Sequence, residues 1–284
     1  PMERIDNFCI ASTKHKRPIV TDLRYVKTSA KKPVVIFCHG YKGYKDWGAW
    51  NLAGQEFAKK GIFFVKFNFS HNGGTLKEPI DFPDLQAFGE NNYTIELNDL
   101  DDVINWTITN NDYTDEIDTN DITLIGHSRG GGIATLMASQ NIKVSRIISW
   151  AGVSDFASRF PKGEALELWR KEGVRFIING RTNQKMPHLF QFYEDFEKHA
   201  DALNIQAAAS QLSKPHLIIQ GTEDQAVTLD EAQNLHRWNP NSELLIMEGM
   251  NHTLGSAQPW HHDTMPEFLA QAVDYSISFI LRGS

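Results

Sequence analysis

Short apolar runs alternate with segments of helical periodicity along most of this chain. Residues 33–38 are a continuous apolar run, typical of a strand covered on both faces, and residues 93–109 carry apolar side chains at helical spacing. Further strands are predicted at 5–11, 19–26, 62–69, 121–125, 146–151, 216–220 and 243–247, and further helices at 47–60, 130–140, 228–238 and 265–281. The first two strands are expected to form a hairpin. The alternation predicts an α/β protein with a mostly parallel, twisted sheet of about eight strands and helices on both faces.

One long segment interrupts this alternation. About 60 residues, from Asp155 to Lys214, separate two predicted core strands, and they are rich in aromatic and charged side chains. A connection of this length in a compact domain is typical of a functional lid. We therefore predict a single domain over residues 1–284 with a cap- or lid-like insertion at 155–214. The alternative is an excursion that packs on the core without touching a bound ligand.

Composition and charge exclude several classes of protein. The apolar content of 41% is enough for a sizeable core, and the net charge of -7 is spread along the chain with no basic tract. We therefore expect neither a nucleic-acid partner nor a membrane surface, and no apolar run approaches the ~18 residues that span a bilayer. The N-terminal residues show no hydrophobic signal segment, which favours a cytoplasmic location. The only cysteines, Cys9 and Cys38, are expected to be buried free thiols.

The stretch around Ser128 carries the strongest chemical signal. Gly126-His127-Ser128-Arg129-Gly130 is a G-x-S-x-G motif between a predicted strand and a predicted helix. In that context it predicts a strained turn that exposes the serine hydroxyl at the edge of a sheet. The two glycines have a steric reason, because Cβ atoms there would clash with the neighbouring strand and helix.

A serine hydroxyl needs a base within hydrogen-bond reach and a third group to orient that base. In sheets of this kind the chain order is Ser, acid, His, each after a strand. Asp224 follows the strand at 216–220 and is the candidate acid; Glu223 is its rival, one residue nearer the strand. His252 follows the strand at 243–247 and is the candidate base.

Two backbone N–H groups are the candidates to stabilise a developing oxyanion. One belongs to Arg129, directly after the serine, and the other to Tyr41, in the loop after the strand at 33–38. The positive end of the helix that begins beside Ser128 adds to the same spot.

Further side chains are candidates for contact with a substrate. They are His39, which is also expected to shape the loop of Tyr41, and His71, Trp169 and Phe192. Arg129 and Lys42 would favour an anionic substrate, unless Arg129 is held in a structural ion pair. His261 and His262 are adjacent and do not face one ligand position in regular structure, so no metal site is expected.

Together these motifs resemble the α/β-hydrolase superfamily, and within it the dienelactone hydrolase-like and prolyl-oligopeptidase-like group, which includes bacterial carboxylesterases of the cinnamoyl and feruloyl type. The resemblance runs from about residue 17 to the last helix. It implies a Ser128–His252–Asp224 triad and an acyl-enzyme mechanism without a cofactor. Dienelactone hydrolases proper have a cysteine nucleophile, so their lactone activity does not carry over to Ser128. Only about 30 residues precede the strand at 33–38, too few for the propeller of an oligopeptidase.

The expected function is hydrolysis of small or aromatic acyl esters, because an aromatic-rich insertion over the site suits such substrates. A peptidase or amidase, and a thioesterase or lactonase, are alternatives on the same fold. A binding module without catalysis is a further alternative, but it has no need for all three triad groups at once. We expect a monomer or a homodimer acting on a small-molecule ester.

Overall fold

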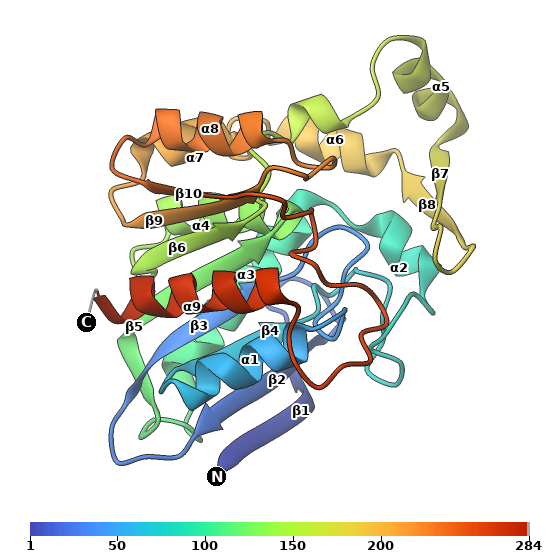
Figure 1. Cartoon of the computed structure of the whole chain (residues 1–284). Coiled ribbons are helices and arrows are strands. Elements are labelled where there is room, and N and C mark those ends of the chain that lie inside the picture. Colours follow the sequence, from blue (N-terminus) through green and yellow to red (C-terminus); the bar gives the residue numbers. More distant parts are fainter. Residues whose placement is uncertain (283–284) are drawn as a thin grey trace.

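The computed structural model describes residues 1–282, and its centre is a single eight-stranded sheet (Figure 1). The strand order is β1-β2-β4-β3-β5-β6-β9-β10. Only β2 runs against its neighbours, and every other adjacent pair is parallel. The strands are β1 (Met2–Ile10), β2 (Ile19–Val26), β3 (Lys32–Cys38), β4 (Phe63–Phe67), β5 (Ile117–His127), β6 (Arg146–Trp150), β9 (His216–Gly221) and β10 (Glu243–Met247). The predicted α/β class, the hairpin β1–β2 and the mostly parallel sheet are confirmed.

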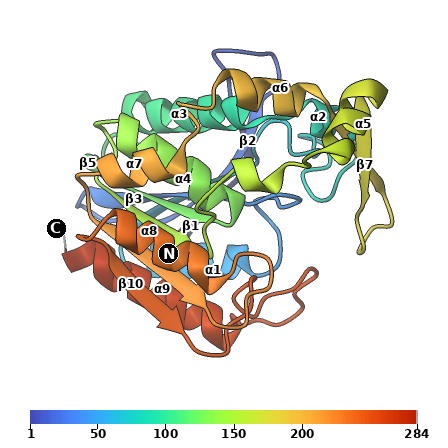
Figure 2. The ribbon, with the colours of Figure 1, turned by 90° about the horizontal axis from the view of Figure 1, so that it is seen from above.

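Helices cover both faces of this sheet (Figures 1 and 2). One face carries α1 (Trp50–Lys59) and α9 (Glu267–Arg282), and the other carries α3 (Tyr93–Thr109), α4 (Arg129–Gln140), α7 (Ile205–Gln211) and α8 (Leu229–Trp238). Successive side chains of β3 point to opposite faces. Val34 and Ile36 therefore pack on the α3–α4 side, whereas Val35 and Phe37 pack on the α1–α9 side. This is why the strand is an unbroken apolar run.

The inserted segment lies beyond the carboxyl ends of the parallel strands (Figure 1). It contains η1 (Ala157–Arg159), α5 (Glu164–Glu172), the antiparallel strands β7 (Val174–Ile178) and β8 (Lys185–Leu189), and α6 (Gln191–Lys198). Helix α2 (Leu85–Glu90) packs against β8. Helix α7 packs against α4 and α8. The part that projects from the core layers is therefore η1 to α6, and α7 is one of the helices that cover the sheet.

The start of one helix and the exposure of one cysteine differ from what the sequence predicts. Helix α1 begins at Trp50 rather than at 47, because Gly48 takes a φ of 57°, which is incompatible with a right-handed helix. Cys9 is exposed, whereas Cys38 is buried as expected. Cys9 lies on the edge strand β1, whose register shifts between Ile5 and Phe8, so its side chain faces solvent.

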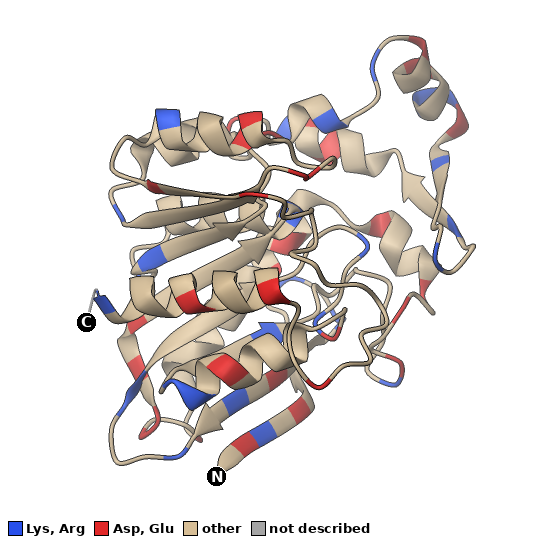
Figure 3. Ribbon diagram, in the orientation of Figure 1, with Lys and Arg blue, Asp and Glu red and all other residues tan. Residues whose placement is uncertain are grey.

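Charged residues of both signs are interspersed over the molecule in the view of Figure 3. No helix within residues 1–282 is both long enough and apolar enough to cross a membrane.

Candidate active site

Ser128 occupies the tight turn between β5 and α4. Its φ of 57° and ψ of -120° are strained for a residue with a side chain. A Cβ at Gly126 would lie 2.2 Å from the carbonyl oxygen of Gly130, and one at Gly130 would lie 2.3 Å from the carbonyl oxygen of Cys38. Both approaches are far inside van der Waals contact, so the turn requires both glycines. These are the helix and strand clashes expected from the motif.

Ser128, His252 and Asp224 lie in one hydrogen-bonded row. The Oγ of Ser128 is 3.0 Å from Nε2 of His252, and Nδ1 of His252 is 2.8 Å from Oδ2 of Asp224. An ionised carboxylate can only accept, so Nδ1 carries the proton and Nε2 is left to accept one from the serine hydroxyl. His252 follows β10 and Asp224 follows β9, so the sheet brings these three distant residues together.

The loop around Asp224 holds its carboxylate in the ionised form. Oδ1 accepts hydrogen bonds from the backbone N–H groups of Ala226 (2.9 Å) and Val227 (2.8 Å). Burial alone would raise the pKa of Asp224, but the hydrogen bond from His252 and those from the two N–H groups outweigh it and keep this pKa below its usual value. The rival Glu223 is exposed, so the acid that meets His252 is Asp224.

The backbone of the loop after β3 lies against the serine. A Cβ built on Gly40 would be 3.0 Å from the Cβ of Ser128 and 3.7 Å from the backbone nitrogen of Arg129. Within residues 1–282, no protein group accepts a hydrogen bond from the N–H of Tyr41 or of Arg129. Free backbone N–H groups are donors of the kind that can bind an oxyanion, and these two directly follow Gly40 and Ser128, the residues that approach each other here.

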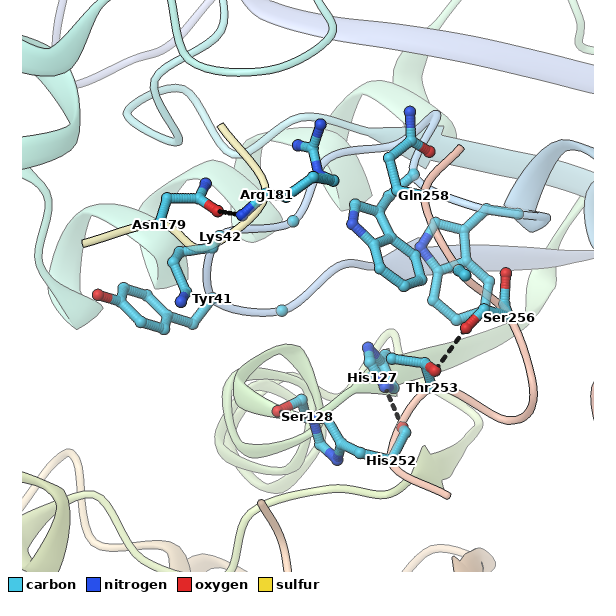
Figure 4. A pocket seen from close by; sticks show the side chains of 15 residues that line it. Tyr41, Lys42, His127, Ser128, Asn179, Arg181, His252, Thr253, Ser256 and Gln258 are labelled. Carbon is cyan, nitrogen blue, oxygen red and sulfur yellow. Dashed lines mark hydrogen bonds between the residues drawn. The ribbon is translucent and has the colours of Figure 1, made fainter. Parts of the chain in front are cut away.

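His127 ties His252 to the turn of Ser128. Its Nε2–H donates a 2.8 Å hydrogen bond to the backbone carbonyl of His252 (Figure 4). Burial lowers the pKa of His127 to about 3, which keeps the ring neutral and able to donate. The residue before Ser128 therefore positions the loop that carries His252.

Two cavities meet at Ser128 and His252. The loop cavity, about 390 Å³, lies between the loops that follow β3 and β10 (Figure 4) and is walled by Trp47 and Trp50. The cap cavity, about 470 Å³, is walled in part by the inserted segment. Tyr41 and Lys42 also line both. The remaining side chains of the cap cavity are mainly aromatic and basic: Tyr93, Arg129, Val153, Phe156, Arg159, Phe160, Pro161, Trp169, Arg175, Ile177, His188, Phe192, Ala226 and Val227.

Two of the four expected substrate contacts line a cavity and two do not. Trp169 and Phe192 line the cap cavity. His39 and His71 line neither cavity, and their expected contact with a substrate is corrected accordingly. His39 is turned under its own loop, where Nε2 accepts from the N–H of Phe69 (3.1 Å) and Nδ1–H donates to the carbonyl of Gly40 (2.9 Å).

His39 therefore links the ends of β3 and β4 and supports the loop of Tyr41. His71 is hydrogen-bonded to Ser70 Oγ at 2.8 Å. Burial lowers the pKa of both rings to about 4. Sequence analysis did not single out Tyr93, His188 and Arg175, which line the cap cavity, because they lie in segments without a motif. No cluster of residues able to hold a metal ion occurs within residues 1–282.

A twisted parallel sheet with a serine at the turn after β5, and with an acid and a histidine after later strands, defines the α/β-hydrolase fold. Within that superfamily the BD-FAE family model matches residues 22–239, and the chain belongs to the BD-FAE family. It is an esterase/lipase-type hydrolase.

Three proteins similar to this chain share less than a quarter of its residues. The protein named "Putative esterase/lipase 2" of Mycoplasma genitalium is 22% identical, covering 94% of this chain and 96% of its own. A solved structure named "Putative hydrolase" from Agrobacterium vitis has a TM-score of 0.73 at 17% identity and covers 99% of both chains. Est1E of Butyrivibrio proteoclasticus, solved with ferulic acid bound, has a TM-score of 0.68 at 17% identity and covers 98% of both.

Proposed function

We propose that this chain hydrolyses carboxylic esters through an acyl-enzyme formed on Ser128. The observation that carries the proposal is the row of two hydrogen bonds from Asp224 through His252 to Ser128. Each group in that row has the partner that the chemistry of a serine nucleophile requires.

In the first half of the reaction, Oγ of Ser128 attacks the ester carbonyl carbon while Nε2 of His252 takes the hydroxyl proton. The carbonyl oxygen becomes an oxyanion, which accepts hydrogen bonds from the N–H groups of Tyr41 and Arg129. When the intermediate collapses, the bond to the leaving alcohol breaks, and the alcohol takes the proton from His252.

In the second half, His252 removes a proton from water, whose oxygen attacks the acyl carbon. Collapse of this second intermediate releases the carboxylic acid and returns the proton to Ser128. Asp224 stays ionised throughout and stabilises the imidazolium form of His252. These steps need only the chain's own groups and water.

The acyl or alcohol part of the substrate is proposed to be small or aromatic. Rings of Tyr93, Phe160, Trp169 and Phe192 line the cap cavity, and flat side chains of this kind favour flat apolar groups. Est1E, a structural neighbour with the same fold, was solved with ferulic acid bound, and ferulic acid is a small aromatic acid.

Turnover of a p-nitrophenyl ester series, from acetyl to octanoyl, together with methyl ferulate, tests the proposal. Ser128→Ala should lower kcat by at least ~10³-fold, whereas Ser210→Ala, an exposed serine on α7, should match the wild type. Mass spectrometry after treatment with a phosphonate ester should find the label on Ser128 alone. Ser128-dependent cleavage of amides, thioesters or lactones but of no ester would replace the ester proposal by one of those activities.

A further inference from the structure

The wall of the cap cavity is positively charged. Lys42, Arg129, Arg159 and Arg175 line it, and none of its lining residues is Asp or Glu. A cavity that contains only positive charge attracts an anion, provided that carboxylates outside the lining do not neutralise its cations. The partners of each cation therefore decide what the cavity can bind.

Within residues 1–282, only one of these four cations has an ion-pair partner. Arg159 is paired with Glu231, whose Oε2 lies 2.6 Å from its guanidinium. Within the described part of the chain, no carboxylate oxygen lies within 4.0 Å of a side-chain nitrogen of Arg129, Arg175 or Lys42. The structural ion pair that the sequence left open for Arg129 is therefore not made.

Aromatic rings hold the guanidinium of Arg129 in place of a carboxylate. Its carbon lies 4.4 Å from the ring centre of Tyr41, 5.1 Å from that of Tyr93 and 5.3 Å from that of Phe192. Arg175 is placed in the same way, 5.6 Å from the ring centre of Trp169. Stacking fixes the plane of a guanidinium and leaves its N–H groups free to meet a carboxylate.

One nearby carboxyl group, that of Glu96 on α3, does not change this account. Its Oε2 accepts a 2.9 Å hydrogen bond from Asn91, and it does not line the cavity. Burial raises the pKa of Glu96 and the charge of Arg129 opposes that rise, but within the described residues no oxygen of Glu96 lies within 4.0 Å of a side-chain nitrogen of Arg129.

His188 marks where the free cations converge. Its Nε2 accepts a 2.7 Å hydrogen bond from the hydroxyl of Tyr41. Burial, together with the charges of Arg129, Arg175 and Lys42, lowers the pKa of His188 to about 3, so the ring is neutral. The three cations therefore act on one buried wall, and that wall begins at the residue next to Ser128.

We propose that the substrate carries a carboxylate on the part that fills the cap cavity, and that Arg129 and Arg175 bind this carboxylate. The proposal rests on ester hydrolysis at Ser128 and names the substrate class for that reaction. The planar fork of a guanidinium fits the two oxygens of a carboxylate, and such charge-assisted pairs are the strong ones. The carboxylate can belong to the acyl part, as in a half-ester of a dicarboxylic acid, or to the alcohol part.

Two matched substrate pairs distinguish these sources. Mono-p-nitrophenyl adipate is compared with p-nitrophenyl heptanoate, which has a similar acyl length and no charge. 4-Acetoxybenzoate is compared with 4-acetoxybenzamide, which differs only in the charge of the leaving group. In one pair the wild type should prefer the anionic ester in kcat/KM by about tenfold or more.

The ratio within each pair is the readout, because it cancels any general loss of activity. Arg175→Met and Arg129→Met should each remove most of the preference, and Arg175→Lys should keep part of it. Arg129→Met retains the backbone N–H at that position. Arg170→Met is the matched control, because Arg170 is an exposed arginine of the insertion outside the cavity, stacked on Phe190, and its ratio should equal that of the wild type.

Titration of Ser128→Ala with monomethyl adipate and with methyl heptanoate, which has no carboxylate, measures binding without turnover. Tighter binding of monomethyl adipate that Arg175→Met abolishes would support the proposal. Ser128-dependent turnover of the neutral esters without preference for either anionic ester would overturn the carboxylate proposal and leave ester hydrolysis intact. A protein that turns over no ester would instead remove the proposed function on which this inference rests.

Discussion

The two carboxylate oxygens of Asp224 have different partners. Oδ1 accepts from the N–H groups of Ala226 and Val227, whereas Oδ2 accepts from Nδ1 of His252 and, at 3.2 Å, from Nε2 of Gln220. The loop contacts fix which oxygen faces the imidazole. The atom at the Oδ2 position therefore sets the tautomer of His252. That tautomer in turn decides whether Nε2 can accept a proton.

Replacing that atom predicts the effect of Asp224→Asn. The amide oxygen would keep the two backbone donors, so the amide nitrogen would face Nδ1 of His252 and donate to it. The proton would then sit on Nε2, which could no longer take the proton of Ser128. We expect kcat for esters to fall by roughly 10⁴-fold with little change in thermal stability.

Glu223→Gln is the matched control for this prediction, because it makes the same chemical change one residue away on an exposed side chain. Its kcat should stay within about twofold of the wild type. Equal losses in the two variants would contradict the assignment of Asp224.

The sequence predicted the residues of the site where a motif fixed the backbone. Ser128 followed from two glycines with a steric role, and Asp224 and His252 followed from the order of strands. His39 and His71 were misjudged as substrate contacts, because a residue at the end of a strand can turn under its loop as readily as into a cavity. Which way it turns depends on the partner it meets, here the N–H of Phe69 for His39.

At the scale of elements, the inserted segment is held unevenly. Helix α6 is tied to α3, where Thr94 donates to Asp195 (2.6 Å) and Asn92 donates to Gln191 (2.8 Å). Helices α5 and α6 each bury a single residue, Trp169 and Phe192, but the side-chain hydrogen bond of Trp169 goes to the carbonyl of His188 within the insertion (2.8 Å). Fewer bonds to the core imply a lower free energy of local opening for α5, so the two helices should differ in their motion.

Hydrogen exchange followed by mass spectrometry checks this expectation. Amides of α5 should exchange at least ~10-fold faster than those of α6. Thr94→Val removes the hydroxyl donor to Asp195 at nearly constant volume and should speed exchange in α6 while leaving α5 unchanged. Equal protection of the two helices in the wild type would mean that the insertion moves as one body.

Element prediction succeeded for periodic helices and for apolar strands and missed the short elements of the insertion. The bounds of α3 were predicted at both ends, because its apolar positions recur over seventeen residues, starting directly after Asn92 and ending directly before Asn110. Strands β7 and β8 were not predicted, because they mix charged, aromatic and apolar side chains, whereas the equally short β10 is mostly apolar. Their pairing depends on contacts with α2 and the site loops, and no local pattern encodes those contacts.

At the scale of the whole molecule, several histidines are buried in neutral form. Burial lowers the pKa of His39 and His71 to about 4 and that of His127, His188 and His216 to about 3. The ordinary pKa of a histidine is 6.5. Between the lowered pKa of each ring and 6.5, the unfolded chain therefore binds more protons than the folded chain. The free energy of unfolding therefore falls as the pH drops below about 6.5, by up to about 1.4 kcal/mol per pH unit for each such histidine.

His216 allows this effect to be measured away from the site. It bonds to Ser149 Oγ at 2.8 Å within the sheet. In urea unfolding between pH 7 and 5, the free energy of unfolding of His216→Gln should fall less steeply with decreasing pH than that of the wild type. The difference in slope should correspond to about one fewer proton taken up on unfolding. The exposed His262→Gln serves as control, and an unchanged slope in His216→Gln would show that this ring is not neutral in the fold.

The two cavities that share Ser128 and His252 have a consequence for the order of events. If the ester lies across both, the departing alcohol empties one cavity while the acyl group still fills the other. The emptied space then gives water its own approach to the acyl carbon, so hydrolysis does not wait for the acid to move. The same emptied cavity would admit a second alcohol. Whether the acyl group passes to water or to another alcohol would therefore depend on what enters the cavity that the first alcohol has left.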